Sequence, residues 1–192
     1  MDVYFKKEII YPFAGQKFTF AIANTLFSTF DLDHGTDILI RAITSSNPKS
    51  ILDIGCGYGA LGIILAKNNP QAEVIMVDRD LLAVRYTKYN IKKNNVTNAT
   101  GLGSLGMESV KDKTFDLIVS NIPAKIGDEA IVQEFVLDPY QHLNPNGEYW
   151  FVVVSGLNRL IPHIGGKHNI KIEYVRKRSG HTVYRIKKPV TL

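Results

Sequence analysis

The chain has 192 residues, one cysteine and a formal net charge of +5. This length is typical of one domain, and it buries enough apolar surface to need neither disulfides nor a structural metal. A single cysteine excludes a disulfide framework and a cysteine-based zinc cluster. No apolar run is long enough to span a bilayer, and the first residues, MDVYFKKEII, lack the apolar core of a signal peptide. We therefore expect a soluble, cytoplasmic protein of one domain, without a membrane anchor.

The charge is distributed unevenly along the chain. Residues 1–154 contain 14 Lys and Arg against 17 Asp and Glu, whereas residues 155–192 contain nine against a single acid. A basic segment beside a nearly neutral body is typical of a surface that binds a polyanion. It is also typical of a solvated sheet edge rich in lysine. Composition leaves both interpretations open.

Strands and helices are predicted to alternate over most of the chain. Residues 1–30 are predicted to be irregular, with interleaved aromatic side chains. Helical spacing predicts a helix over Asp37–Ile43, with Asp33 as its N-cap. From Ser50 onward, the alternation favours a parallel sheet with helices on both faces. The predicted strands are Ser50–Ile54, Glu73–Val77, Val96–Leu102, Phe115–Ser120 and Tyr149–Val154, and the predicted helices are Ala60–Lys67, Leu81–Asn94, Asp128–Leu143 and Leu157–Ile164, with a turn over 144–147.

The end of the chain departs from this alternation. Two further predicted strands, Ile170–Lys177 and Thr182–Lys187, are separated by four residues. So short a connection excludes a parallel crossover and predicts an antiparallel hairpin. Six cations lie on or near this hairpin: Arg176, Lys177, Arg178, Arg185, Lys187 and Lys188.

A glycine-rich loop connects the first buried strand to the next helix. Asp53 precedes Gly55, Gly57 and Gly59 in the pattern Asp-x-Gly-x-Gly-x-Gly. Such glycines let a backbone approach a ligand at a helix N-terminus. No Lys-Ser/Thr follows, which excludes a P-loop, and the spacing departs from the G-x-G-x-x-G of dinucleotide sites. The pattern resembles motif I of class I methyltransferases, which bind S-adenosylmethionine (AdoMet). We interpret Cys56, inside the loop, as a small filler and not a nucleophile.

An acidic residue follows the second strand of the predicted sheet. Asp78 stands at the end of Val74-Ile-Met-Val, 23 residues after Gly55. A carboxylate at this position can accept the two hydroxyl hydrogens of a ribose. The alternative is a helix N-cap, a role that Asp80 could fill as well. We expect Asp78 to bind the ribose, beside Arg79.

The motif Asn121-Ile-Pro-Ala follows the strand Phe115–Ser120. It resembles motif IV, N-P-P-F/Y, of methyltransferases that act on planar nitrogens. An exocyclic amine is a poor nucleophile, and an Asn oxygen with a backbone carbonyl can accept its two hydrogens and aim its lone pair. Proline fixes the turn that directs these oxygens. Together with further matches, this motif makes the chain resemble the small-domain (MTS) methyltransferases, which include enzymes that methylate N2 of guanine in ribosomal RNA. The matching segments are Leu26–Ser28, Leu32–Thr36, Asp53–Gly62, Asp78, Ala83, Asn90, Phe115–Pro123 and Pro145–Trp150.

This resemblance implies an α/β class I methyltransferase (Rossmann-like) fold. Its seven-stranded sheet has the order 3-2-1-4-5-7-6, with the last strand antiparallel and helices on both faces. The chain is similar to compact archaeal-type members, with a single domain over 1–192 whose residues 1–33 form an N-terminal extension. The implied function is AdoMet-dependent methylation of an exocyclic base amine in RNA, at guanine N2 of ribosomal RNA, without a metal.

The resemblance also implies site residues. Asn121 and Pro123 are the expected catalytic residues. The expected substrate-binding residues are Phe27, Lys125, Arg176, Lys177 and Arg178. The expected cofactor-binding residues are Thr36, Asp53, Gly55, Cys56, Gly57, Gly59, Asp78, Arg79, Ser104 and Asn121.

The sequence departs from the family pattern at two places. Ile122 replaces the second proline of motif IV, and Ala124 replaces the aromatic residue that stacks on the base. The acid that contacts adenine after the third strand is also missing, so Ser104 or a backbone amide takes that contact. Two alternatives stay open: a methyltransferase of protein glutamine amides, and an RNA-binding module that retains the fold without catalysis. A nicotinamide oxidoreductase disagrees with the glycine spacing.

Overall fold

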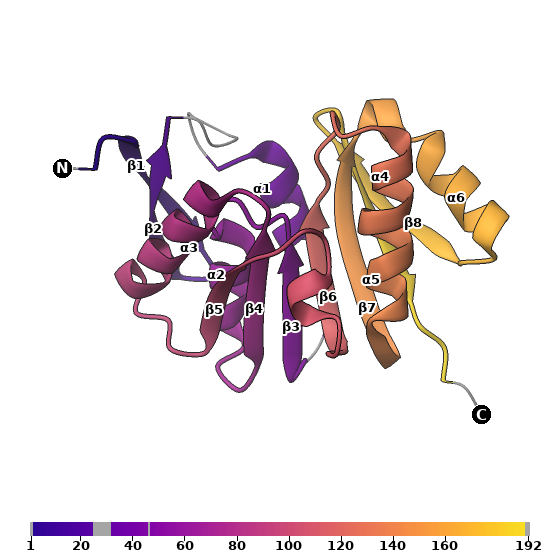
Figure 1. Cartoon of the computed structure of the whole chain (residues 1–192), viewed down its shortest axis with the longest axis horizontal. Helices are drawn as coiled ribbons and strands as arrows, with labels where there is room; N and C mark the ends of the chain where they lie inside the picture. The colour runs from indigo at the N-terminus through magenta and orange to yellow at the C-terminus, as the bar shows by residue number, and fades with distance from the viewer. Residues whose placement is uncertain (1, 25–31, 46, 191–192) are drawn as a thin grey trace.

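The computed structural model describes residues 2–24, 32–45 and 47–190. Its centre is a seven-stranded sheet of order β5-β4-β3-β6-β7-β9-β8 (Figure 1). Neighbouring strands pair in parallel, except that β9 is antiparallel to both β7 and β8. Counted along the chain, this is the order 3-2-1-4-5-7-6, so the predicted sheet and terminal hairpin are confirmed. The strands are β3 Ser50–Ile54, β4 Glu73–Asp78, β5 Ala99–Gly103, β6 Phe115–Asn121, β7 Leu143–Val154, β8 Ile172–Arg178 and β9 His181–Lys187.

Helices cover both faces of the sheet because side chains along each strand alternate between two cores. On β3, Ile51 belongs to one core, and Leu52 and Ile54 belong to the other. The first core packs against α1 His34–Ile40, α2 Ala60–Asn68 and α3 Leu81–Lys93. The second packs against the short helix η1 Glu108–Val110, α4 Asp128–Val132, the π-helix η2 Gln133–Leu137, α5 Asp138–Gln141, the short helix η3 Ser155–Leu157 and α6 Leu160–His168.

The N-terminal segment is a β-hairpin, so the prediction of an irregular segment over 1–30 is wrong for residues 5–23. Strands β1 Phe5–Phe13 and β2 Gln16–Ala23 pair antiparallel around a turn at Ala14 and Gly15, both with positive φ. Two of the interleaved aromatic residues, Phe18 and Phe20, form the inward side of β2 and are buried in the first core, as is Tyr11 of β1. Their period of two is the signature of a strand with one buried face.

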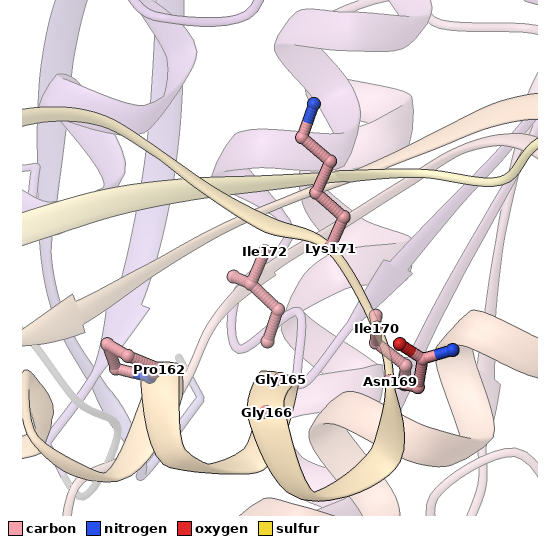
Figure 2. A pocket seen from close by; sticks show the side chains of 7 residues that line it. All are labelled: Pro162, Gly165, Gly166, Asn169, Ile170, Lys171 and Ile172. Atoms are coloured by element: carbon pink, nitrogen blue, oxygen red, sulfur yellow. The ribbon is translucent and has the colours of Figure 1, made fainter.

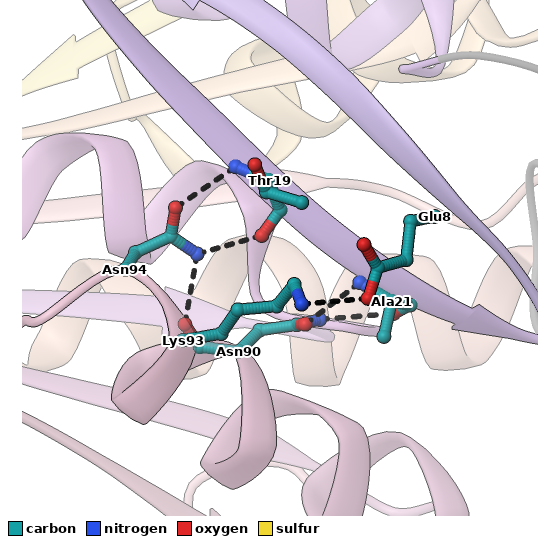
Figure 3. A network of polar contacts seen from close by, with 6 residues as sticks. All are labelled: Glu8, Thr19, Ala21, Asn90, Lys93 and Asn94. Carbon is teal, nitrogen blue, oxygen red and sulfur yellow. Dashed lines mark hydrogen bonds and ion pairs between the residues drawn. The ribbon is translucent and has the colours of Figure 1, made fainter.

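Asparagine side chains of α3 fasten this hairpin to the body (Figure 3). The Asn90 amide accepts from Ala21 N at 2.8 Å and donates to Ala21 O at 3.0 Å, so it pairs with the unfilled edge of β2. Asn94 makes the same two contacts with Thr19, both at 2.9 Å. Lys93 adds an ion pair with Glu8 at 2.6 Å. The amides of α3 and its C-cap thus continue the β-ladder and join β2 to the body of the fold.

Several other predicted boundaries differ from the structure. The helix over Asp128–Leu143 ends at Gln141 and contains a π-helical turn over 133–137. The turn over 144–147 is a bulge inside β7, where the register with β6 shifts between Phe115 and Leu117. The helix predicted from Leu157 begins at Leu160 and continues to His168. Helix α1 runs from His34 to Ile40 and not from Asp37 to Ile43. Asp33 is nevertheless its N-cap as predicted, and the Asp33 carboxylate accepts from Thr36 N.

Candidate functional site

The glycine loop, α1 and the loop after β6 meet at the carboxyl edge of the sheet. Strands β3, β4 and β6 all end at this edge, and open α/β sheets bind ligands there. The N-terminus of α1 lies above the end of β6, because the Asn121 side chain contacts it directly. The candidate site is therefore the crevice bounded by these segments.

The glycine loop has the backbone that its sequence requires. Gly55, Gly57 and Gly59 have φ values of +69°, +57° and +88°, a region that favours glycine. Gly55 N and Cys56 N both donate to Val77 O, at 2.9 and 3.0 Å, which ties the loop to the end of β4. A Cβ built on Gly57 would meet nothing within 4 Å, so this part of the loop faces open space. The exposed backbone can therefore contact a ligand closely.

Asp53 is buried beneath the loop. Its side chain is 1% exposed, and Oδ2 accepts from Gly62 N in the first turn of α2 at 2.9 Å. Burial raises the pKa of the Asp53 carboxyl to about 7. The hydrogen bond from Gly62 N lowers this pKa, and the nearby charge of Asp78 raises it, but burial is the largest effect. The structure thus gives Asp53 the task of joining β3 to α2, immediately below the ligand-facing backbone.

Asp78 and Asp80 divide two roles between them. Asp80 caps α3, accepting from Leu82 N at 2.8 Å. Asp78 instead accepts from Gly57 N at 2.8 Å and from Asp80 N at 2.9 Å, so its carboxylate borders the glycine loop. Burial raises the pKa of the Asp78 carboxyl, and these backbone bonds oppose the rise. Each oxygen keeps a lone pair for a further donor. The neighbouring Arg79 is exposed.

The remaining predicted cofactor residues line the same end of the sheet. Cys56 is buried, with Sγ 3.5 Å from the hydroxyl of Thr87, and burial raises the pKa of its thiol. Thr87 also donates to Gly57 O at 2.8 Å. Ser104 is 9% exposed, and its hydroxyl donates to Gly106 O at 2.9 Å and accepts from Ser109 N at 3.0 Å. The only donor of the Ser104 side chain is therefore engaged within its own loop.

Two leucines that the sequence reasoning missed flank this loop. Leu81 is 75% exposed and Leu105 is 64% exposed. A Cβ on Gly103 would lie 3.0 Å from Leu81 Cδ2, so Leu81 closes over the end of β5. Large apolar side chains left exposed at a crevice mark a surface for an apolar ligand face. No sequence pattern distinguishes these leucines from core positions of the same type.

Asn121 has a fixed orientation at the end of β6. Its Nδ2 donates to Asp33 Oδ2 at 2.6 Å and to Thr36 Oγ1 at 3.1 Å, both at the start of α1. Because the Asp33 carboxylate accepts but does not donate, the Asn121 amide cannot be flipped without losing its shortest bond. Asn121 Oδ1 is therefore turned away from Asp33. The helix cap predicted for Asp33 thus has a second role, in holding Asn121.

The loop after Asn121 turns outward. Ile122 is 2% exposed and packs in the second core, which accounts for an apolar residue in place of the usual second proline. Pro123, Ala124 and Lys125 are exposed. Phe27, predicted to contact substrate, lies outside the described residues.

Three of the six cations on or near the terminal hairpin lie at its exposed end. We call Arg176, Lys177 and Arg178 the basic tip; all three are exposed. Two of the other three are already engaged: Arg185 pairs with Glu173 at 3.0 Å and with Glu148 at 3.8 Å, and Lys188 Nζ donates to backbone carbonyls at 2.8 and 2.9 Å. The third, Lys187, is exposed at the other end of β9. A count of six equivalent phosphate-binding charges is therefore too high.

Helix α1 links the basic tip to the N-terminal hairpin. Asp37 accepts from Tyr11 Oη at 2.6 Å and from Arg41 Nε at 2.8 Å. Burial raises the pKa of Asp37, but the bonds from Tyr11 and Arg41, together with the charges of Arg41 and Arg178, outweigh it and hold this pKa below its usual range. Arg178 pairs with His181 across the hairpin, and a Cβ built on Gly35 would lie 3.1 Å from His181 Cδ2, so the basic tip lies near the start of α1, on the rim of the candidate site.

The other hollows and residue clusters do not extend this site. A hollow of about 350 Å³ lies between α6 and the start of β8, at the opposite edge of the sheet, lined by Pro162, Gly165, Gly166, Asn169, Ile170, Lys171 and Ile172 (Figure 2). It includes none of the predicted site residues. Among the residues that the structure describes, no group of His, Cys, Asp and Glu is arranged to hold a metal. No described helix is both long and apolar enough to cross a bilayer.

Comparisons with known proteins agree with this geometry. The Bacillus subtilis protein YbxB, which is itself uncharacterised, is 29% identical over 175 residues, covering 89% of this chain and 86% of its own length. A ribosomal RNA small subunit methyltransferase C from Marinomonas is 31% identical over 186 residues, covering 92% of this chain and 52% of its own length. The chain thus spans about half the length of this RNA methyltransferase.

The structural comparison gives a similar result. T. thermophilus RsmC, a 16S rRNA N2 guanine methyltransferase solved with AdoMet and guanosine, superimposes with a TM-score of 0.80 at 25% identity. The match covers 95% of this chain and 50% of RsmC. The family model described as "Methyltransferase small domain" matches residues 17–185. The chain therefore belongs to the methyltransferase small domain family of AdoMet-dependent enzymes.

Proposed function

We propose that this protein transfers a methyl group from AdoMet to the exocyclic N2 of a guanine in ribosomal RNA. The observation that carries the proposal is the orientation of Asn121, whose amide nitrogen is held by Asp33 and Thr36 and whose oxygen is left as an acceptor. The names of related enzymes supply the nucleobase: T. thermophilus RsmC is named as acting on N2 of a 16S rRNA guanine, and the Marinomonas relative at 31% identity is named as a ribosomal RNA methyltransferase.

The crevice fits AdoMet. Gly57 leaves open space beside the loop, Asp78 borders it with free lone pairs, and the exposed Leu81 and Leu105 offer apolar surfaces for an adenine ring. Because the Ser104 hydroxyl is engaged within its loop, we assign Ser104 the task of shaping that loop and not of binding the ring. Bound there, AdoMet supplies a methyl group already activated by a sulfonium.

The protein residues would then hold the acceptor. Asn121 Oδ1 accepts one hydrogen of the amine, and we assign the other hydrogen to the backbone carbonyl of Ile122. In the transfer, the nitrogen lone pair forms the new N–C bond, and the electrons of the C–S bond return to sulfur. The product is S-adenosylhomocysteine, and the methylated amine loses one proton to water. Since the methyl group needs no activation, orientation and the electrostatics of the site account for the rate.

The basic tip supports RNA as the substrate class. Arg176, Lys177 and Arg178 are exposed, and Arg178 pairs with His181, which lies near the start of α1 at the rim of the crevice. Contacts to phosphates position a nucleic acid without choosing the base. Base choice then depends on the groups near Asn121, while the tip provides affinity that decreases with salt.

The test separates the acceptor role of Asn121 from cofactor binding. We expect Asn121→Ala to lower methyl transfer to ribosomal RNA about a hundredfold or more, since the acceptor amine is no longer aimed. Its AdoMet affinity, measured by calorimetry, should stay within about threefold of the parent value. Gln133→Ala, which removes an exposed amide on the opposite side of the sheet, is the matched control. Transfer by Asn121→Ala at the parent rate would reject the proposal, and label in protein alone would favour a glutamine-amide substrate.

A further inference from the structure

The imidazole of His181 lies at the acceptor end of the site, although its residue belongs to the last strand of the chain. A Cβ built on Gly35 would lie 3.1 Å from His181 Cδ2 and 3.1 Å from Asn121 Oδ1. The ring edge and the amide oxygen therefore both border the same backbone position, at the start of α1. Strand β9 brings His181 there because it runs opposite to its neighbours and begins at the edge where they end.

Gly35 is buried, and its lack of a side chain lets Asn121 and His181 approach the same backbone atom from different elements. The same Cβ would also lie 2.9 Å from Asp33 Oδ2, so any larger residue at position 35 would crowd three polar side chains. Glycine at position 35 thus lets His181 and Asn121 lie close to one another at the start of α1.

The orientation of the His181 ring follows from its other contact. Nδ1 lies 3.0 Å from Ser179 O, and a carbonyl oxygen accepts but does not donate. Nδ1 therefore carries the hydrogen, and in the neutral ring Nε2 is an acceptor. Cδ2, the atom nearest Gly35, is bonded directly to Nε2. The ring edge that lies nearest to Gly35 and Asn121 thus includes the nitrogen with the free lone pair.

Two neighbouring acceptors distinguish one nucleobase from the others. In guanine, the exocyclic amine stands next to N1–H, so this edge offers two adjacent donors. In adenine and cytosine, the amine stands next to a ring nitrogen that accepts. An acceptor beside Asn121 Oδ1 therefore favours guanine and leaves adenine or cytosine with two opposed lone pairs. Such a mismatch is costly when the groups are buried.

We infer that His181 is a specificity-determining residue, whose Nε2 accepts the N1 hydrogen of the target guanine while Asn121 Oδ1 accepts from N2. This inference rests on the proposed function, because it concerns the acceptor of the same reaction. It gives a base-reading role to a residue from the hairpin that carries the basic tip. It also places a ring at the acceptor site of a chain whose motif IV has Ala124 in the usual aromatic position.

The test combines a change in the enzyme with a change in the base. The substrates are five-nucleotide RNAs with one central base between uridines, which have no exocyclic amine. The central base is guanine, 2-aminopurine or adenine. 2-Aminopurine keeps the 2-amino group but has no hydrogen on N1; it also lacks O6, so the measured quantity is the change in the guanine to 2-aminopurine ratio between enzymes. Initial rates with saturating labelled AdoMet give kcat/KM for each pair.

For the unmodified protein we expect kcat/KM with the guanine RNA to exceed kcat/KM with the 2-aminopurine RNA by about tenfold or more, which is the effect of one acceptor left without its hydrogen bond. His181→Ala should lower this ratio to below about twofold, and His181→Gln, whose side-chain oxygen can accept, should retain part of it. His163→Ala, on the exposed side of α6, should not change it. An equal loss on both bases in His181→Ala, with the ratio preserved, would overturn the inference but not the proposed function. Methylation of the adenine RNA and not the guanine RNA would overturn both.

Discussion

Replacement of the buried Asp53 by asparagine should change how stability depends on pH. The pKa of this carboxyl is about 7 in the folded protein, well above the ordinary value of 3.8, chiefly because of burial. Between these two values the unfolded chain releases a proton that the native state retains. Stability therefore falls as the pH rises from about 4 to about 7, and it is constant above that range. An asparagine in place of Asp53 would keep an oxygen for Gly62 N and would have no proton to lose.

The magnitude follows from the size of the shift. A difference of about three pKa units corresponds to about 4 kcal/mol at most, or about 1.4 kcal/mol per pH unit. The assay is urea unfolding of the parent and Asp53→Asn proteins at several pH values from 4.5 to 7.5. We expect the stability of the variant relative to the parent to increase from pH 4.5 to about pH 7 and to level off above that.

A second carboxyl provides the control. Hydrogen bonds from Asn144, Lys49 and Ser50 outweigh the effect of burial and lower the pKa of Asp116. The stability that ionised Asp116 contributes is fully present above the pKa that this carboxyl has in the unfolded chain. It is lost only as the pH falls through the lower pKa of Asp116 in the folded protein. The stability difference between Asp116→Asn and the parent should therefore be flat from pH 4.5 to 7.5. A difference for Asp53→Asn that is equally flat would refute the reasoning, because it would show that Asp53 ionises normally.

Three further predictions concern the cofactor, the RNA and the hairpin. Asp78→Ala should weaken AdoMet binding by roughly 1.5–3 kcal/mol in calorimetry, because a hydrogen-bond acceptor beside the glycine loop is lost. Asp80→Ala removes only a helix cap, so it should lower the free energy of unfolding by about 1 kcal/mol and leave AdoMet affinity unchanged. Equal AdoMet affinities for the two variants would contradict this prediction. Alanine at all three positions of the basic tip should flatten the salt dependence of RNA binding by roughly 0.7–0.9 for each phosphate that is no longer neutralised, whereas Arg185→Ala, which removes an already paired charge, should not. Asn90→Ala should lower the free energy of unfolding by about 2–4 kcal/mol in urea titrations, since buried backbone groups of Ala21 lose their partners; a cost below about 1 kcal/mol would argue against this anchor.

Local sequence was sufficient where a residue acts through its own segment. The glycine loop, the cap at Asp33 and the antiparallel terminal pair each depend on residues a few positions apart, and each is found as predicted. The sequence likewise left Asp78 and Asp80 as alternative N-caps of the following helix, and in the structure Asp80 is the cap.

Long-range contacts account for what the sequence did not predict. The hairpin formed by β1 and β2 gains much of its support from asparagines of α3, about 70 residues away in the chain. The charge of Arg185 is paired with Glu173 across neighbouring strands, which a count of cations ignores. His181 reaches Gly35 only because the last strand is reversed. In each case the partner is determined by topology and not by spacing.

The most direct test of the proposed function is to find which atom receives the methyl group. The protein is incubated with labelled AdoMet and total RNA from a strain that lacks its gene, and digested nucleosides are identified by mass spectrometry. A parallel sample of total protein tests the glutamine-amide alternative, and Asn121→Ala serves as the inactive control. The proposed function predicts label in N2-methylguanosine from ribosomal RNA, absent with the control. Label in a methylated adenine or cytosine amine, or in protein glutamine alone, would contradict it.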